Sequence, residues 1–458
     1  MGTLARQQGA RQPAGRRRRR ARGAGAGTMG AMFPLRAPVV LAALTFVVGC
    51  PTDAPPDDPD DPHGEPLSLT LPRHGIGPAE LGVIVNTDDP LSAPIAEAYL
   101  AARGIPEANR LDLPLGSQPN LDRDSFVAVQ EALDAAFGPE IQALALTSMQ
   151  PQTVDCMGAA AAFGLGFHTS WCQPGPPCNP TARADSYDSD TTEPFTDHGI
   201  RPTMILAAET LADAEALIAR GVAADGTRPI GARGFLVRTS DSARSSRWEH
   251  LEAAATDWGD LFDLTWIDNS DGAGTDLVEA EADLLFYWTG LTFVDGLETN
   301  TYLPGAVADH LTSFGGQIPT SSQMSALAWL QGGATASYGT AIEPCNYPAK
   351  FPNPEVLIPH YLLGDTVVEA YWKSVWMPGE GNFVGEPLAQ PFGGARTTYA
   401  DGVWTIATTI LRPEQRYALE VETADGWEHV QRIEFEDVGL HTITVEEPVR
   451  AAYRLIED

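Results

Sequence analysis

A dense apolar run at residues 284–288, Leu-Leu-Phe-Tyr-Trp, constrains the fold of this chain more than any other feature. The run ends at Thr289-Gly290, and a polar loop follows it. Consecutive apolar side chains bounded by glycine and loop residues are typical of a strand that is buried on both faces. Such strands occur in α/β sheets, where ligands collect at the carboxyl ends of the strands. We therefore predict an α/β domain whose candidate site lies within residues 283–345.

Alternating strand and helix patterns extend this prediction over residues 79–395. Strands are expected at 81–86, 141–146, 234–238 and 261–266, and helices at 124–137, 211–220, 245–257 and 364–372. This order indicates a mainly parallel sheet with flanking helices, because parallel strands need long crossover connections. Residues 151–202 interrupt the pattern as a long loop, which is uncommon unless the loop is functional or cross-linked. No internal repeat is evident in the sequence.

The period of the apolar pattern changes to two from residue 397. Alternating segments at 404–410, 416–421, 431–435 and 441–445 are separated by turn residues such as Asp425-Gly426. Alternation of this kind predicts antiparallel strands with one buried face. We expect a small β-sandwich of the immunoglobulin or fibronectin type at residues 396–458.

Residues 1–49 have the features of an export leader, with the true start expected at Met29 or Met32. An apolar stretch at residues 37–48, too short to span a bilayer comfortably, ends at Gly49-Cys50. The pattern resembles a bacterial lipoprotein signal in which Cys50 carries the lipid, and an ordinary secretory signal peptide is the alternative. Residues 50–78 would then form a disordered acidic tether. We expect an exported lipoprotein, anchored in the outer membrane of a bacterial envelope.

Acidic residues dominate the composition, with 61 Asp and Glu against 29 Lys and Arg and a net charge of −32. The leader holds nine arginines and no acidic residue, which leaves 20 basic residues and a net charge of −41 beyond it. Such a surface repels nucleic acid, so we exclude a nucleic-acid partner. The only lysines in the chain are Lys350 and Lys373.

Four cysteines lie beyond Cys50, at positions 156, 172, 178 and 345. In an oxidising compartment an even number of cysteines indicates two disulfides, with three possible pairings. We expect the pairs Cys172–Cys178 and Cys156–Cys345. A zinc site is not favoured, because the chain has no Cys-x2-Cys pair and its histidines are scattered.

Polar residues after the apolar run provide the candidate catalytic groups. His310 is a candidate general base and Ser313 a candidate nucleophile, and Asp309 or Glu343 would orient the imidazole. The alternative is that Asp309 and His310 form a structural hydrogen-bonding pair. No Gly-x-Ser-x-Gly elbow surrounds Ser313.

Two further candidate sites lie outside this group. Cys345 with His360 would form a thiol–imidazole pair, and a disulfide or buried structural role for Cys345 is the alternative. Asp185, Asp188 and Asp190 offer hard oxygen ligands for calcium, the one cofactor that the sequence raises. A solvated acidic loop is the alternative for these carboxylates.

Several blocks resemble an uncharacterised family of exported bacterial proteins, over about residues 80–395. The blocks are residues 84–99, 103–109, 239–244, 305–316, 339–345 and 364–372. More distantly, the order of segments is similar to the gingipain-type peptidases of the caspase–haemoglobinase clan, with Gly332-Gly333-Ala334 and Gly385-Glu386-Pro387 as matching segments. In that clan one strand ends in His-Gly and a later strand in the catalytic cysteine, whereas this chain has Thr289-Gly290 and residues 309–313 there.

The resemblance implies the fold of the clan more than its activity, because the matching positions hold neither the cysteine nor the histidine. We therefore expect a non-catalytic cell-envelope protein that binds a peptide, a protein or a glycan. The alternative is a peptidase-like hydrolase with an altered site around Asp309, His310 and Ser313.

Overall fold

The computed structural model describes residues 67–172, 179–413, 415–449 and 451–458. The predicted leader, Cys50 and Cys178 lie outside the described residues. The chain divides into residues 1–62 and 63–458, and the structure below belongs to the second unit. In the described ranges, no helix is long and apolar enough to cross a membrane.

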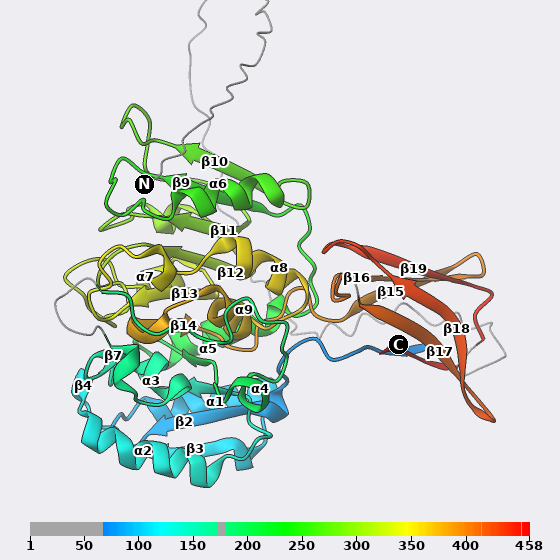
Figure 1. The fold of residues 1–458 in the computed structure, drawn as a ribbon, viewed down its shortest axis with the longest axis horizontal. Helices are drawn as coiled ribbons and strands as arrows, with labels where there is room; N and C mark the ends of the chain where they lie inside the picture. Colours follow the sequence, from blue (N-terminus) through cyan, green and yellow to red (C-terminus); the bar gives the residue numbers. More distant parts are fainter. Residues whose placement is uncertain (1–66, 173–178, 414, 450) are drawn as a thin grey trace, which may run out of the picture. The chain divides into compact units, whose positions relative to one another are not determined.

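A ten-stranded sheet is the main feature of the described residues (Figure 1). Its strands, in spatial order, are β10 (Asp263–Asp268), β9 (Arg233–Arg238), β11 (Leu284–Thr289), β12 (Tyr302–His310), β13 (Ala336–Thr340), β14 (Gly381–Gly385), β8 (Thr203–Ile205), β5 (Ala143–Leu146), β2 (Leu81–Asn86) and β3 (Arg110–Leu113). Strands run parallel from β10 to β13 and from β8 to β3. β14 pairs antiparallel with β13, so the expected α/β architecture is confirmed at a coarse level and the sheet is mixed.

The two parallel groups repeat one topology. The groups are β3-β2-β5-β8 and β10-β9-β11-β12, each written from the outer edge of the sheet inward. In each group the second strand in sequence lies at the outer edge, the first strand lies next to it, and the third and fourth strands follow inward. The repeat extends to single hydrogen bonds, because Asn86 N donates to Ser92 Oγ and Thr239 N donates to Ser245 Oγ, both at 2.9 Å and both across six residues. The internal repeat that the sequence does not display is therefore present in the fold.

Helices pack on both groups of strands. They are α1 (Ser92–Arg103), α2 (Arg123–Ala136), α3 (Ala159–Leu165), α4 (Pro194–His198), α5 (Leu211–Ala224), α6 (Trp248–Asp257), α7 (Leu327–Gly332), α8 (Pro354–Leu362) and α9 (Val367–Ser374). The predicted long loop at 151–202 contains α3, α4 and two short strands, β6 (Thr153–Val154) and β7 (Met157–Gly158), which form a small sheet with β4 (Asn120–Leu121). The described residues of this loop therefore contain more regular structure than the composition of the loop indicates.

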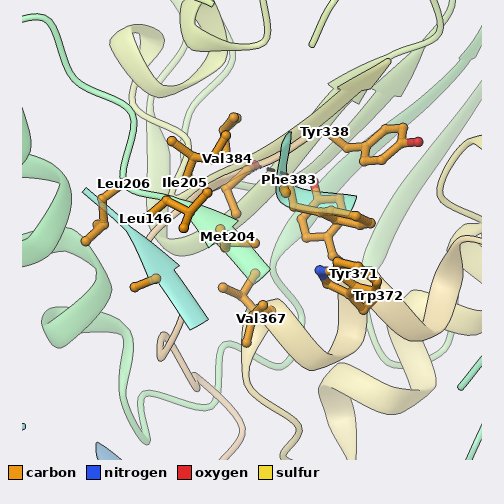
Figure 2. Close-up of a cluster of buried hydrophobic side chains, with 14 of the residues drawn as sticks. Leu146, Met204, Ile205, Leu206, Tyr338, Val367, Tyr371, Trp372, Phe383 and Val384 are labelled. Atoms are coloured by element: carbon orange, nitrogen blue, oxygen red, sulfur yellow. Dashed lines mark hydrogen bonds between the residues drawn. The ribbon is translucent and has the colours of Figure 1, made fainter. Parts of the chain in front are cut away.

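The central core lies where α9 covers the middle of the sheet (Figure 2). The Trp372 ring stacks on Phe383 of β14 at 4.7 Å between centroids, and its indole N–H donates to the Thr203 carbonyl at 2.9 Å. A Cβ at Gly164 would lie 2.6 Å from Trp372, so only glycine fits there. Trp372 is thus a core residue.

Two smaller sheets follow the large one. One sheet has the order β1 (Ser68–Thr70), β20 (Ala452–Glu457), β17 (Arg416–Thr423) and β18 (Gly426–Glu434), and the other has β15 (Ala395–Ala400), β16 (Val403–Thr408) and β19 (His441–Glu446). Side chains from both sheets, such as Trp404 and Tyr453, share one hydrophobic cluster. The predicted antiparallel strands are confirmed, but β1 pairs parallel with β20 and comes from the segment expected to be tether.

Candidate functional site

Asp309 lies near the end of β12 and is fully buried. Its carboxylate forms an ion pair with Arg247 and accepts the Trp288 indole N–H at 3.0 Å. Burial raises the pKa of Asp309, and the contacts with Arg247 and Trp288 oppose that rise. Arg247 is also buried and donates to the Thr289 carbonyl at 3.1 Å. Asp309 therefore neutralises a buried cation instead of orienting an imidazole.

His310 ends β12, and its imidazole is fully buried. The Trp329 indole N–H donates to Nδ1 at 2.9 Å, and Nε2 lies 3.2 Å from the Met324 carbonyl. Because an indole only donates, Nδ1 is the acceptor and Nε2 carries the proton that is donated to Met324. Burial, with a smaller effect of the Arg247 charge, lowers the pKa of His310 to about 3. The imidazole expected to act as general base is therefore buried and neutral at physiological pH, with both ring nitrogens in hydrogen bonds.

Two other residues belong to the catalytic prediction. They are Ser313, the candidate nucleophile, and Thr289, which stands where the clan has its histidine. Ser313 is half-buried, and its carbonyl accepts a hydrogen bond from Thr340 Oγ1 at 2.9 Å. Thr289 lies opposite His310 in the neighbouring strand and is fully buried. The topology thus brings the expected positions together, but the imidazole bonds to Trp329 and Met324 and provides Ser313 with no base.

The disulfide prediction needs correction. Cys156 is bonded to Cys172, with 5.3 Å between their Cα atoms, which replaces both predicted pairs, Cys172–Cys178 and Cys156–Cys345. Cys345 is itself disulfide-bonded, and its backbone N–H donates to Glu343 Oε1 at 2.8 Å. An oxidised Cys345 has no thiolate, so the predicted pair with His360 is not formed and Glu343 has a local structural contact.

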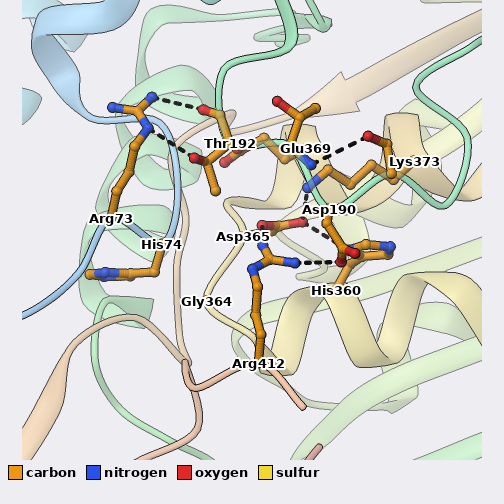
Figure 3. A network of polar contacts seen from close by, with 12 residues as sticks. Arg73, His74, Asp190, Thr192, His360, Gly364, Asp365, Glu369, Lys373 and Arg412 are labelled. Carbon is orange, nitrogen blue, oxygen red and sulfur yellow. Dashed lines mark hydrogen bonds and ion pairs between the residues drawn. The ribbon is translucent and has the colours of Figure 1, made fainter. Parts of the chain in front are cut away.

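The acidic loop, residues 185–190, forms ion pairs with basic side chains from other parts of the chain (Figure 3). Asp188 Oδ1 lies 3.1 Å from His360 Nε2, and Asp190 Oδ1 lies 2.7 Å from Arg412 Nη1. Asp185 is exposed. Among the described residues, no group of three or more His, Cys, Asp or Glu side chains is arranged to hold a metal ion. Two of the three predicted calcium ligands, Asp188 and Asp190, are thus in ion pairs with basic side chains of the protein.

These ion pairs continue into a buried network on α8 and α9 (Figure 3). Asp365 is fully buried, and its carboxylate lies 2.5 Å from Lys373 Nζ and 3.2 Å from His360 Nδ1. Burial raises the pKa of Asp365, but Lys373 and His360 outweigh it and lower the pKa to about 2. Burial and the Asp365 charge raise the pKa of Glu369 to about 7. The network holds α8, α9 and the acidic loop together.

Two buried lysines of this region cannot be recognised from the spacing of apolar residues along the sequence. Lys350 is fully buried and paired with Glu380 at 2.7 Å, and Lys373 is 3% exposed. No lysine of the chain is therefore on the surface. The scarcity of lysine in an acidic chain is the one sequence feature that points to special positions, because a soluble protein ordinarily places lysine on its surface.

No family model and no curated protein matches this chain. A solved structure described as "Structure of Protease" is similar to it, with 11% sequence identity, a TM-score of 0.39, and coverage of 83% of this chain and 97% of that chain. At this TM-score the likeness supports no conclusion about family or activity.

Proposed function

We propose that this chain is an exported, lipid-anchored binding protein of a bacterial envelope, with a caspase–haemoglobinase-like domain that has no peptidase activity. The domain comprises residues 79–395, and residues 396–458 form an immunoglobulin- or fibronectin-like sandwich. The lipid is attached to Cys50, and the bound partner is a peptide, a protein or a glycan. The lipoprotein pattern before Cys50 supports the anchor.

One observation carries the non-catalytic part of this proposal. His310 stands at the carboxyl end of a central strand, where a catalytic base would have to reach substrate, yet it is fully buried with both ring nitrogens bonded to Trp329 and Met324. A general base needs a free nitrogen within hydrogen-bond reach of the proton that it removes. This environment supports a structural role for His310.

The test is labelling of the folded protein with fluorophosphonate and iodoacetamide probes, followed by mass mapping. We expect no labelled residue, while a serine hydrolase and a cysteine peptidase react under the same conditions. A label on Ser313 that His310→Ala abolishes would establish a hydrolase. Ser189 is a second serine whose labelling has to be mapped, because its Oγ lies 3.0 Å from His198 Nε2. A label on Ser189 that His198→Ala abolishes would also overturn the proposal.

A further inference from the structure

A cavity of about 780 Å³ lies between the segment before β2, the acidic loop and the C-terminal sheets. Residues 70–73, Asp190, Thr192, Arg412 and residues 454–457 line it. This volume falls in the range of pockets that take small organic ligands. The cavity is separate from the buried Asp309 and His310.

Three arginines on the wall, each paired with a carboxylate, distinguish this cavity in an acidic protein. Arg73, Arg412 and Arg454 line it, although the chain as a whole has a net charge of −32. The Arg73 guanidinium is fixed by Thr192, through Nε to Oγ1 at 3.0 Å and Nη2 to the carbonyl at 2.7 Å, and by Glu80 at 2.7 Å from Nη1. A guanidinium has five N–H donors, so two donors of Arg73 remain for a ligand.

Arg412 has a counterion that a ligand can replace. Its side chain is 17% exposed, whereas its partner Asp190 is 85% exposed. Its Nη2 atom is buried without a hydrogen-bond partner, 3.7 Å from Asp365 Oδ1. An ion pair with so exposed a carboxylate contributes little stability, because water screens it. A carboxylate of a ligand can therefore take the place of Asp190 on Arg412 at small cost.

The other side chains that line the cavity favour anions of low charge over anions of high charge. Asp190 and Glu457 accept hydrogen bonds and repel ligands of high negative charge, while Thr70, Thr192 and Gln415 both donate and accept. A doubly charged phosphate group is disfavoured beside these carboxylates. A single carboxylate that is accompanied by several hydroxyl groups satisfies both the arginines and the acceptors.

We infer that this cavity binds a uronic acid, either as the free sugar or as a residue of an acidic glycan. This inference rests on the proposed binding function and assigns its ligand class and site. The two sources share one carboxylate and several hydroxyl groups, and they differ in whether neighbouring sugars add contacts outside the cavity.

The experiment is calorimetric titration of the mature protein with sodium D-glucuronate, tri-D-galacturonic acid, D-glucose and inorganic phosphate. We expect both uronates to bind, and the trimer to bind more tightly if a glycan is the source. Arg412→Gln and Arg73→Gln should each weaken binding at least tenfold. Arg123→Gln, an exposed arginine of α2 that pairs with Asp124, is the matched control and should leave binding unchanged.

Three outcomes overturn the inference: no binding of either uronate, equal binding of glucose, or wild-type affinity in both cavity variants that circular dichroism shows to be folded. The labelling experiment decides the proposed function separately. An unlabelled protein that does not bind uronate leaves the binding function standing with another ligand. A labelled Ser313 or Ser189 overturns that function whatever the titration gives.

Discussion

Trp329 donates its indole N–H to Nδ1 of His310, and this contact determines the charge of the imidazole. The proton must lie on Nε2, where the Met324 carbonyl accepts it at 3.2 Å. A second proton would have to enter at Nδ1 and would break the bond with Trp329. The same contact makes His310 a determinant of acid stability.

We predict that His310→Gln reduces the loss of the free energy of unfolding that the protein shows as the pH falls. The pKa of His310 is about 3 in the folded state and 6.5 ordinarily, so between these values the unfolded chain binds more protons and stability falls as pH falls. The expected contribution is on the order of 1 kcal/mol per pH unit in this window. Glutamine can accept from Trp329 and donate to Met324, so it preserves the contacts without titrating.

The measurement is urea unfolding of both proteins at pH 4, 5, 6 and 7. The difference in free energy of unfolding between variant and wild type should increase steadily toward low pH. A difference that is constant over this range would contradict a neutral, buried His310.

The pair Arg247 and Asp309 should show strong coupling. Removing one charge leaves the other buried and unpaired, which costs about 3–5 kcal/mol, whereas replacing both with apolar residues is much less costly. We therefore expect Arg247→Met and Asp309→Leu each to destabilise more than the double variant does. Urea unfolding of the four proteins gives the coupling energy. Additive effects of the two substitutions would contradict a buried ion pair.

Strands and helices with strong local patterns were predictable from the sequence. The run at 284–288 is β11, and the amphipathic pattern at 124–137 is α2, because each segment buries one regular set of apolar side chains. β14 was missed because Gly381 and Gly385 lower its strand propensity. Its place in the sheet depends on pairing with β13 and on cover by α9, which no local window contains.

The repeat was hidden for a related reason. The segments Asn-Thr-Asp-Asp-Pro-Leu-Ser at 86–92 and Thr-Ser-Asp-Ser-Ala-Arg-Ser at 239–245 share only Asp at the third position and Ser at the seventh. The serine makes the same hydrogen bond in both, but two shared positions do not stand out in a sequence of this length. The roles of Asp309 and His310 also depended on distant partners, Arg247 and Trp329, which spacing along the chain cannot reveal.

Both lysines should resist amine reagents in the folded protein. Lys350 Nζ lies 2.7 Å from Glu380 and Lys373 Nζ lies 2.5 Å from Asp365, and neither side chain is accessible. Acylation needs a neutral, accessible amine. Treatment with an N-hydroxysuccinimide ester should therefore modify neither lysine in the native state and both after unfolding in urea. Modification of either lysine at native conditions would show that the buried pairs do not form.

The bond between Cys156 and Cys172 should stabilise the segment around α3. A disulfide that closes a loop of 16 residues stabilises by about 3 kcal/mol in the chain-entropy account. We expect the Cys156→Ser/Cys172→Ser variant to lose a free energy of unfolding of this order. Digestion of the unreduced protein should yield one linked peptide pair that contains both residues. A linked pair of Cys156 with any other cysteine would refute the assignment.

Glu369→Gln should stabilise the protein at neutral and alkaline pH. The pKa of Glu369 is about 7 when folded and 4.5 ordinarily, so the folded state binds more protons between these values and stability falls as pH rises through the window. Glu369 Oε2 accepts from the N–H groups of Ile76 and Thr366, and Oε1 is buried without a partner. The side-chain carbonyl of glutamine can accept these two hydrogen bonds without acquiring a charge.

The difference between Glu369→Gln and wild type should therefore be near zero below pH 4.5, increase to at most about 3 kcal/mol by pH 7, and stay constant above it. Urea unfolding from pH 4 to pH 8 measures it. Asp365→Asn is the matched comparison, because the pKa of Asp365 is about 2 and its charge pairs with Lys373. That variant should be destabilised throughout this range. If Glu369→Gln were also destabilised throughout this range, Glu369 would be a charged partner of Lys373 at all these pH values, and the raised pKa of Glu369 would be wrong.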